Sequence, residues 1–371
     1  MKVIQILPEL HTGGVERGTL EVAAALVEAG HESLVISNGG RLVEALEAAG
    51  SRHITMPVHR KSLATLGQVR PLRRLLEQEK PDIIHIRSRV PGWVTWLAWR
   101  KMDPATRPRL VSTVHGFYST NFYSAVMTKG ERVIAVSNSI RDYILRHYPQ
   151  AEDAKIRVIH RGVSPEDFPR NYEPSAEWQQ QWRQEHPQLE GKKTLLLPGR
   201  ITRWKGQQDF IELIAALKAK GEAVHGLICG NTHPKKRAFL TELQELAAKL
   251  GVEDDITFLG HRSDVSEIMA SCDLALSLSR DPEAFGRVSL EAAAIGKPVV
   301  GYDHGGVAEQ LAALFPQGRV PVGNTSKLLD TTLELLNAPV TPKPVQAPFT
   351  REAMTAATLS VYEELHQEPR S

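Results

Sequence analysis

The 371-residue chain is poor in cysteine and lacks any long apolar run. Its two cysteines, Cys229 and Cys272, are far apart, lack metal-ligand spacing and lie in apolar segments. We expect them to be buried free thiols, as in a protein of a reducing compartment. No apolar run could span a bilayer, and Met1–Leu7 is typical of a strand rather than a signal peptide. We therefore expect a cytoplasmic protein whose membrane contact is at most peripheral, at the inner face of the cytoplasmic membrane.

The net charge is only +2, but it is unevenly distributed. Basic residues outnumber acidic ones by seven in residues 1–170, and acidic residues outnumber basic ones by five in the rest. A basic first half favours an anionic partner, such as a phosphorylated glycan or an anionic lipid, although a solvated basic surface explains it equally well. We expect no nucleic-acid partner, because the basic side lacks the interleaved aromatic residues of such surfaces.

Short apolar runs alternate with helical patterns along the whole chain, in two series. The strands are expected at Val3–Leu7, Ser33–Ile36, Ile83–Ile86, Leu110–Val114, Val133–Val136 and Ile156–Ile159, then at Thr194–Leu197, Val224–Cys229, Ile256–Leu259, Leu274–Leu278 and Pro298–Tyr302. This pattern predicts two doubly wound, Rossmann-like α/β domains with parallel sheets, facing each other across a cleft. The predicted domains span 1–163 and 192–350, with a junction at 164–191. We expect a last helix, 351–367, to pack back on the first domain.

The first loop, after the strand Val3–Leu7, contains Gly13, Gly14 and Glu16. Paired glycines let a ligand approach the backbone, and the helix N-terminus that follows favours an anion. A tight turn with a carboxylate in the first helical turn explains the same residues. The loop does not match the G-x-G-x-x-G pattern, which disfavours NAD.

Two later strand ends in the first half carry polar candidates. His115 follows the strand Leu110–Val114 and would point into the cleft, although a structural histidine is the commoner reading for that residue alone. Ser137-Asn138-Ser139 predicts an N-cap for a helix that begins near Ile140. Asn138 and Glu16 are also candidates for binding an acceptor.

The first loop of the second half, Gly199–Gly206, carries two cations just before a helix. Arg200 offers a planar fork of donors, and Lys205 offers a point charge. Two cations beside a helix N-terminus suit a diphosphate. The alternative interpretation is that Arg200 and Lys205 are ordinary surface cations without a ligand.

The segment Glu283–Glu291 carries the strongest signal in the chain. Glu283 lies in the loop after a strand, and Glu291 lies about one turn into the helix expected over Val288–Ile295. Gly286 lets the backbone meet a ligand, and the amides after it begin a helix without partners. The segment therefore offers one carboxylate for sugar hydroxyls, amides for a phosphate and a second carboxylate for a ribose diol.

These residues together resemble glycosyltransferase family 4, the retaining enzymes of the GT-B fold. The likeness extends to enzymes that build bacterial lipopolysaccharide core and surface polysaccharide. The matched features are Gly199-Arg200, Lys205-Gly206, Phe258-Leu259-Gly260, Glu283 and Glu291 with seven residues between them, Ala292–Val300, and Gly305-Gly306 followed by Glu309. Gly13-Gly14, His115 and Val136-Ser137 fit the same pattern.

The resemblance implies a role for each candidate. It implies that Arg200 and Lys205 bind the donor diphosphate and that Glu291 binds the ribose. Glu283 and the backbone around Phe285, Gly286, Arg287 and Val288 would hold the transferred sugar, which His115 would reach from the first domain, and Gly14 would let the first loop approach the reacting centre. Two departures bear on loop geometry: His160-Arg161-Gly162 replaces a common Asn-Gly, and Arg280–Pro282 are additional residues before Glu283.

The resemblance implies an enzyme that transfers a sugar from a nucleotide-diphosphate sugar, with a UDP-sugar favoured. The acceptor is expected to be a glycan or a glycolipid, either with or without a phosphate group. No D-x-D triple occurs, so we expect cations to replace a metal ion, and we expect no cofactor. Two alternatives remain: a nucleotide-sugar 2-epimerase of the same fold, and a non-catalytic nucleotide-sugar-binding partner.

The basic first half suggests contact with an anionic membrane. One basic stretch runs from His59-Arg60-Lys61 through Arg70, Arg73 and Arg74. A second one, from Arg87 to Arg109, contains Trp93, Trp96 and Trp99 at helical spacing. A core-facing stripe explains the tryptophans alone somewhat better, whereas the flanking arginines also fit an interfacial surface.

Overall fold

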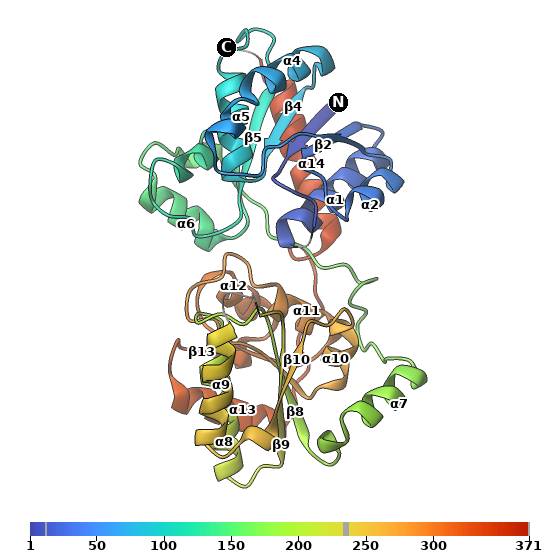
Figure 1. Cartoon of the computed structure of the whole chain (residues 1–371), viewed down its shortest axis with the longest axis vertical. Helices are drawn as coiled ribbons and strands as arrows, with labels where there is room; N and C mark the ends of the chain where they lie inside the picture. The colour runs from blue at the N-terminus through green and yellow to red at the C-terminus, as the bar shows by residue number, and fades with distance from the viewer. Residues whose placement is uncertain (12, 233–236, 370–371) are drawn as a thin grey trace. The chain divides into compact units, whose positions relative to one another are not determined.

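The computed structural model describes residues 1–11, 13–232 and 237–369, and it divides into two compact units (Figure 1). Unit 1 comprises Met1–Gly162 together with the chain from Arg351 onward, and unit 2 comprises Val163–Thr350. The segment that we expected to be a junction, 164–191, lies within unit 2 and contains helix α7 (Ala176–Glu185). Trp178 of this helix donates to Asp264 Oδ2 at 2.8 Å, which ties α7 to its unit.

Unit 1 is built on a parallel sheet of seven strands among the described residues, in the order β3-β2-β1-β4-β5-β6-β7. The strands are β1 (Lys2–Ile6), β2 (Glu32–Ser37), β3 (Arg52–Thr55), β4 (Ile83–Ile86), β5 (Arg109–Val114), β6 (Arg132–Ala135) and β7 (Ile156–Val158). The helices are α1 (Gly14–Glu28), α2 (Val43–Ala48), α3 (Leu63–Leu66), α4 (Val69–Glu79), α5 (Arg89–Trp99), α6 (Asn138–His147) and α14 (Arg351–Gln367), with short 3-10 turns η1 (Ser124–Thr128) and η2 (Asp153–Lys155).

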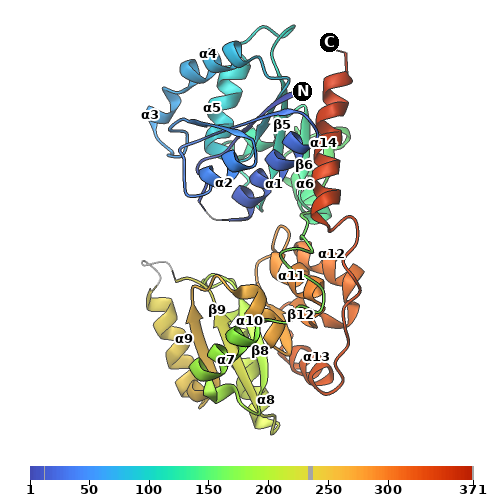
Figure 2. The same ribbon diagram turned by 90° about the vertical axis from the view of Figure 1, so that its right-hand side faces the viewer.

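Helix α14 joins unit 1 although nearly two hundred residues separate it from the rest of that unit. Figure 2 shows it beside α1, against which it packs. Its residues Met354, Val361, Tyr362 and Leu365 complete an apolar core with strand and α1 residues such as Val22. The buried apolar stripe of α14 is the physical reason for this return, since it covers one face of the sheet.

Unit 2 is built on a second all-parallel sheet, whose described strands follow the order β10-β9-β8-β11-β12-β13. They are β8 (Lys193–Pro198), β9 (Val224–Cys229), β10 (Ile256–Gly260), β11 (Leu274–Ser277), β12 (Val299–Tyr302) and β13 (Arg319–Val320). The helices beside α7 are α8 (Gln207–Ala219), α9 (Arg237–Lys249), α10 (Val265–Ser271), α11 (Arg287–Ile295), α12 (Gly305–Leu314) and α13 (Thr325–Asn337), with 3-10 turns η3 (Pro187–Leu189), η5 (Glu253–Asp255) and η6 (Pro316–Gly318).

The predicted fold class of two doubly wound α/β domains with parallel sheets is confirmed, and every strand expected from the sequence is present. Two strands were missed, β3 and β13. β3 reads Arg-His-Ile-Thr at the sheet edge, and β13 has only two residues, so neither shows an apolar run. Cys229 and Cys272 are free thiols, and burial raises their pKa values to about 11 and about 12. In the described ranges no helix is both long enough and apolar enough to cross a bilayer.

Candidate active site

Strands β8 and β11 are neighbours in unit 2, and the chain proceeds from them toward opposite edges of the sheet. A doubly wound sheet binds ligands beyond the carboxyl ends of its strands at such a reversal point. The loops that follow these two strands are 199–206 and 278–286, which contain most of the residues that the sequence singled out. Strand pairing therefore brings the two motifs together.

Lys205 and Glu283 meet across these two loops. Lys205 Nζ donates to Glu283 Oε1 at 2.8 Å, and the two side chains are only 16% and 15% exposed. The hydroxyl of Ser279 donates to the same carboxylate oxygen. His304 Nε2 in turn donates to the backbone carbonyl of Ser279 at 2.7 Å. The site thus holds a cation and an anion in fixed positions, supported by two residues that the sequence analysis missed.

Two glycines in left-handed backbone conformations start the helices of the site. Gly206 (φ 75°) precedes α8, and a Cβ there would lie 2.0 Å from the carbonyl oxygen of Leu278. Gly286 (φ 84°) precedes α11, and a Cβ there would lie 2.4 Å from Val307. Only glycine allows such close approach with positive φ. Both helix N-termini, with their first amides and positive dipole ends, consequently face the end of the sheet where ligands bind.

Glu291 lies on α11 and receives a hydrogen bond from Arg287 Nε at 3.0 Å. The Nη2 atom of Arg287 is buried and has no hydrogen-bond partner among the described residues. A buried guanidinium nitrogen without a partner is costly unless a ligand satisfies it. From the sequence we expect Arg287 to contribute its backbone amide, whereas in the structure its side chain is a further donor.

The remaining donor candidates differ in their surroundings. Arg200 is exposed, and no acidic partner for its side chain occurs in the part of the chain that the structure describes. Phe285 is 5% exposed and packs toward Phe349, with 6.5 Å between the ring centroids. Its side chain is therefore part of the core, and its backbone carbonyl accepts a hydrogen bond from Gln310 Nε2 at 2.6 Å. Val288, in the first turn of α11, is half-buried.

The additional residues before Glu283 are anchored to the fold. Arg280 Nε lies 3.1 and 3.0 Å from the two carboxylate oxygens of Asp209, a fully buried residue in the first turn of α8. The Tyr302 hydroxyl donates to the same carboxylate at 2.6 Å. Burial of the phenol, together with the hydrogen bond to this carboxylate, raises the pKa of Tyr302. The insertion thus fixes the loop that carries Glu283.

In unit 1 the corresponding reversal lies between β1 and β4. Gly14 is the exposed first residue of α1, and the Glu16 carboxylate folds back to within 2.5 Å of where a Cβ on Gly13 would stand.

Ser137 accepts a hydrogen bond from Ile140 N at 3.1 Å, which confirms the predicted N-cap of α6. Asn138 is the exposed residue after that cap.

His115 follows β5, and its ring contacts Arg161. Arg161 Nη2 donates to His115 Nδ1, and the buried Nε2 has no partner among the described residues. Burial and the neighbouring guanidinium hold the pKa of His115 well below its ordinary value. The ring is therefore neutral near pH 7, and its proton is on Nε2 because Nδ1 accepts.

Arg161 crosses α1 at Gly18, where a Cβ would stand 2.3 Å from Arg161 Nη1. Arg161 is part of His160-Arg161-Gly162, the first departure from the family pattern. Its role could not be predicted from the sequence, because its contact with His115 joins segments that are far apart along the chain. A second buried arginine, Arg87, was missed. It donates to Gln5 Oε1 at 2.6 Å, and its buried Nη2 has no partner in the described ranges.

The chain matches two families that together span most of its length. Residues 12–167 match the family described as Glycosyltransferase Family 4, and residues 179–346 match Glycosyl transferases group 1. The N-acetyl-alpha-D-glucosaminyl L-malate synthase of Bacillus anthracis is 26% identical over 331 residues, which cover 85% of this chain and 82% of that protein. The lipopolysaccharide glucosyltransferase WaaG of Escherichia coli K12 is 32% identical over 165 residues, covering 43% of this chain and 41% of its own.

Solved structures give the same answer for the fold. A glycosyltransferase from Rickettsia africae ESF-5 superimposes with a TM-score of 0.84 at 28% identity, over 99% of each chain. Anabaena Alr3699/HepE, solved with UDP and glucose, gives a TM-score of 0.73 at 23% identity over 99% of this chain and 97% of its own. The chain therefore belongs to the family 4 glycosyltransferases and has the GT-B fold of two parallel-sheet, Rossmann-like domains.

Proposed function

We propose that this glycosyltransferase takes its sugar from a UDP-sugar and transfers it with retention of configuration. The observation that carries the proposal is the Lys205–Glu283 pair between two helix N-termini, at the reversal point of the unit 2 sheet. A nucleotide-diphosphate sugar has an anionic diphosphate and several hydroxyls, which match a cation, free amides and carboxylates. The complex of HepE with UDP supports uridine as the base.

Each group of the donor has a proposed partner. Lys205, Arg200 and the N-terminal amides of α8 and α11 bind the diphosphate, with Arg287 Nη2 as a further donor. Glu291 accepts from the ribose hydroxyls, and Glu283 accepts from hydroxyls of the transferred sugar. The neutral ring of His115 donates from Nε2 to a substrate hydroxyl.

Catalysis would rest on stabilising the leaving group. Negative charge grows on the diphosphate as the glycosidic bond breaks, and the preorganised cation and amides meet that charge without reorganising. A single element of this kind contributes about 10²–10³ in rate. The attacking acceptor hydroxyl loses its proton to the departing phosphate, and the new bond forms on the same face of the sugar.

A metal ion is not needed in this scheme. Within the described residues, no group of three or more His, Cys, Asp or Glu side chains lies close enough together to hold a metal ion. The cations Lys205, Arg200 and Arg287 supply the positive charge instead.

For the acceptor we propose a glycan or glycolipid of the bacterial surface, as in lipopolysaccharide core assembly. The name of WaaG, a lipopolysaccharide glucosyltransferase, supports this choice, whereas the N-acetyl-alpha-D-glucosaminyl L-malate synthase is named for a product that contains a small acid. WaaG is named as a glucosyltransferase, which favours transfer over the epimerase alternative.

A donor screen followed by product analysis tests the proposal. Thermal shift with UDP-, GDP- and ADP-sugars identifies the base, and NMR of the product gives its anomeric configuration. We expect the largest shift with a UDP-sugar and a product with the donor's configuration. An inverted product, or an epimer formed from donor alone, would refute the mechanism.

A further inference from the structure

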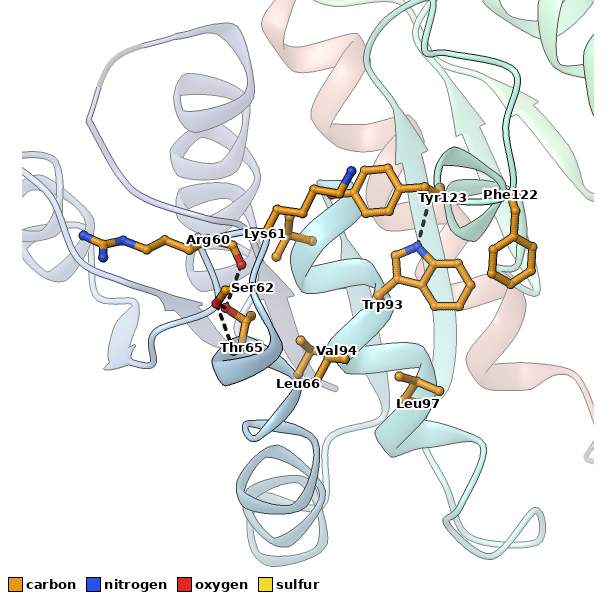
Figure 3. A pocket seen from close by; sticks show the side chains of 11 residues that line it. Arg60, Lys61, Ser62, Thr65, Leu66, Trp93, Val94, Leu97, Phe122 and Tyr123 are labelled. Carbon is orange, nitrogen blue, oxygen red and sulfur yellow. Dashed lines mark hydrogen bonds between the residues drawn. The ribbon is translucent and has the colours of Figure 1, made fainter.

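Three segments of unit 1 line an open cavity of about 570 Å³ (Figure 3). They are the stretch Arg60–Leu66, which follows β3; the start of α5, which follows β4; and the loop before η1, which follows β5. All three therefore lie at the carboxyl edge of the sheet, where doubly wound folds bind ligands. The volume falls in the range of about 300–1,000 Å³ typical of small-molecule pockets.

The lining of this cavity is mostly apolar and partly open to solvent. Its apolar side chains are those of Leu66, Val90, Trp93, Val94, Leu97 and Phe122. Phe122 is 76% exposed and Leu66 44% exposed, and the Phe122 ring lies 4.9 Å from Trp93. Trp93 Nε1 donates to the Tyr123 carbonyl at 2.8 Å, so its polar atom is satisfied and its ring carbons face the cavity (Figure 3). Exposed apolar surface of this kind marks a binding site.

Two cations lie over the ring of Tyr123, a residue that lines the cavity; Lys61 also lines the cavity, whereas Arg89 stands behind the ring. Lys61 Nζ lies 4.4 Å from the ring centroid, and the Arg89 guanidinium lies 5.5 Å from it. Figure 3 shows the Lys61 ammonium directed toward Tyr123, whereas the side chain of Arg60 extends away. Arg89 also donates to Ser124 Oγ at 3.3 Å, and neither cation has a carboxylate partner in the described part of the chain. Lys61, with Arg89 beside the same ring, therefore gives one side of the cavity positive charge that no carboxylate of the described residues neutralises.

We propose that this cavity binds the acceptor and that the acceptor is an anionic amphiphile: its apolar chain fills the space beside Trp93 and its phosphate meets Lys61 and Arg89. The inference rests on the proposed function, because it names the acceptor class of the same enzyme. An apolar chain alone would leave the two cations unused, and a free phosphorylated sugar would leave the aromatic lining exposed. An amphiphile satisfies both halves of the site.

The tryptophans do not favour docking of a membrane surface over binding of a single amphiphile. Trp99 is 9% exposed and donates to the Pro108 carbonyl at 2.7 Å, so it faces the core. Trp96 is half-buried, with Arg100 and Lys129 each 4.7 Å from its ring centroid. Of these three tryptophans, only Trp93 lines the cavity, so they do not form one continuous interfacial stripe.

Calorimetry with n-decyl phosphate below its micellar concentration tests the proposal on the full chain. Decyl maltoside supplies a chain without a phosphate, inorganic phosphate supplies the anion alone, and phosphatidylglycerol vesicles supply an anionic membrane. Leu66→Trp fills the cavity from its rim, and Lys61→Glu reverses the charge. Their matched controls are Leu250→Trp and Lys101→Glu, at exposed positions elsewhere.

We expect decyl phosphate to bind the wild type and both controls, and Leu66→Trp to abolish binding. Lys61→Glu should weaken the binding of decyl phosphate about tenfold, which corresponds to about 1.4 kcal/mol, and should leave the affinity for decyl maltoside unchanged. Binding that survives Leu66→Trp, or binding to vesicles without binding to monomeric decyl phosphate, would overturn the proposal. UDP is titrated into the same samples: if UDP binds and decyl phosphate does not, only this inference fails, whereas absent UDP binding contradicts the proposed function itself.

Discussion

Arg161 donates a hydrogen bond to Nδ1 of His115, which leaves the buried Nε2 of the ring as the nitrogen that carries the proton. The two residues come from segments after different strands, and Gly18 of α1 leaves room for the guanidinium. Burial first, and then the Arg161 guanidinium, lower the pKa of His115 and keep the ring neutral, because a nearby positive charge opposes a second one. A histidine proposed to donate to a substrate hydroxyl is thereby held ready in one tautomer.

We expect Arg161→Met to raise the pKa of His115, because the substitution removes the guanidinium that lowers it. The acid limb of the pH–rate profile should move to higher pH, and ¹⁵N NMR should show a mixture of ring tautomers. Arg161→Lys, which keeps the charge, should restore most of the acid limb. An unchanged acid limb in a folded Arg161→Met variant would show that Arg161 serves the structure alone.

Lys205→Ala should lower kcat by about 10²–10³, because the leaving diphosphate loses one preorganised charge. Arg203→Ala is the matched control: Arg203 lies on the same loop but forms an exposed ion pair with Glu242 at 2.6 Å. Steady-state kinetics with the best donor gives both values. Equal activity of the two variants would remove Lys205 from the site.

Chelation should leave the activity intact. Lys205 and the helix N-termini provide the positive charge that a divalent ion provides in other transferases, so transfer should continue in EDTA. The rate is measured before and after dialysis against chelator. Loss of activity that Mg²⁺ or Mn²⁺ restores would contradict the metal-free scheme.

His85 should make the protein less stable in mild acid. Its ring is fully buried between the Tyr362 hydroxyl and Thr113 Oγ1, each at 2.6 Å, and burial first, then Arg87, lowers its pKa well below 6.5. Below about pH 6.5 the His85 ring binds a proton in the unfolded chain but stays neutral in the folded protein. The free energy of unfolding should therefore fall by up to about 1.4 kcal/mol for each unit by which the pH is lowered, for each such group.

Urea unfolding between pH 7.5 and 5.5 measures this dependence. His85→Asn should reduce the slope of the free energy of unfolding against pH, even though the variant is less stable throughout. His147→Asn, at an exposed position of α6, should leave the slope as it is. An identical slope in wild type and His85→Asn would show that His85 does not carry the effect.

The sequence predicted the fold and the loops of the unit 2 site because both depend on local patterns. Apolar runs mark buried strands, and Gly206 and Gly286 mark helix starts. What it missed depends on contacts between distant segments. Ser279 and His304 support Glu283 only once β11 and β12 are paired, and Arg161 reaches His115 only in the folded unit.

The most direct test of the account is UDP binding to a Glu291→Ala variant, measured by calorimetry. Glu291 is proposed to accept from the ribose, and a hydrogen bond to a charged acceptor contributes about 1.5–3 kcal/mol. The account predicts UDP affinity at least about tenfold weaker than wild type. Glu334→Ala, on α13, should bind UDP as the wild type does. Unchanged UDP affinity in a folded Glu291→Ala variant would contradict the placement of the nucleotide at α11.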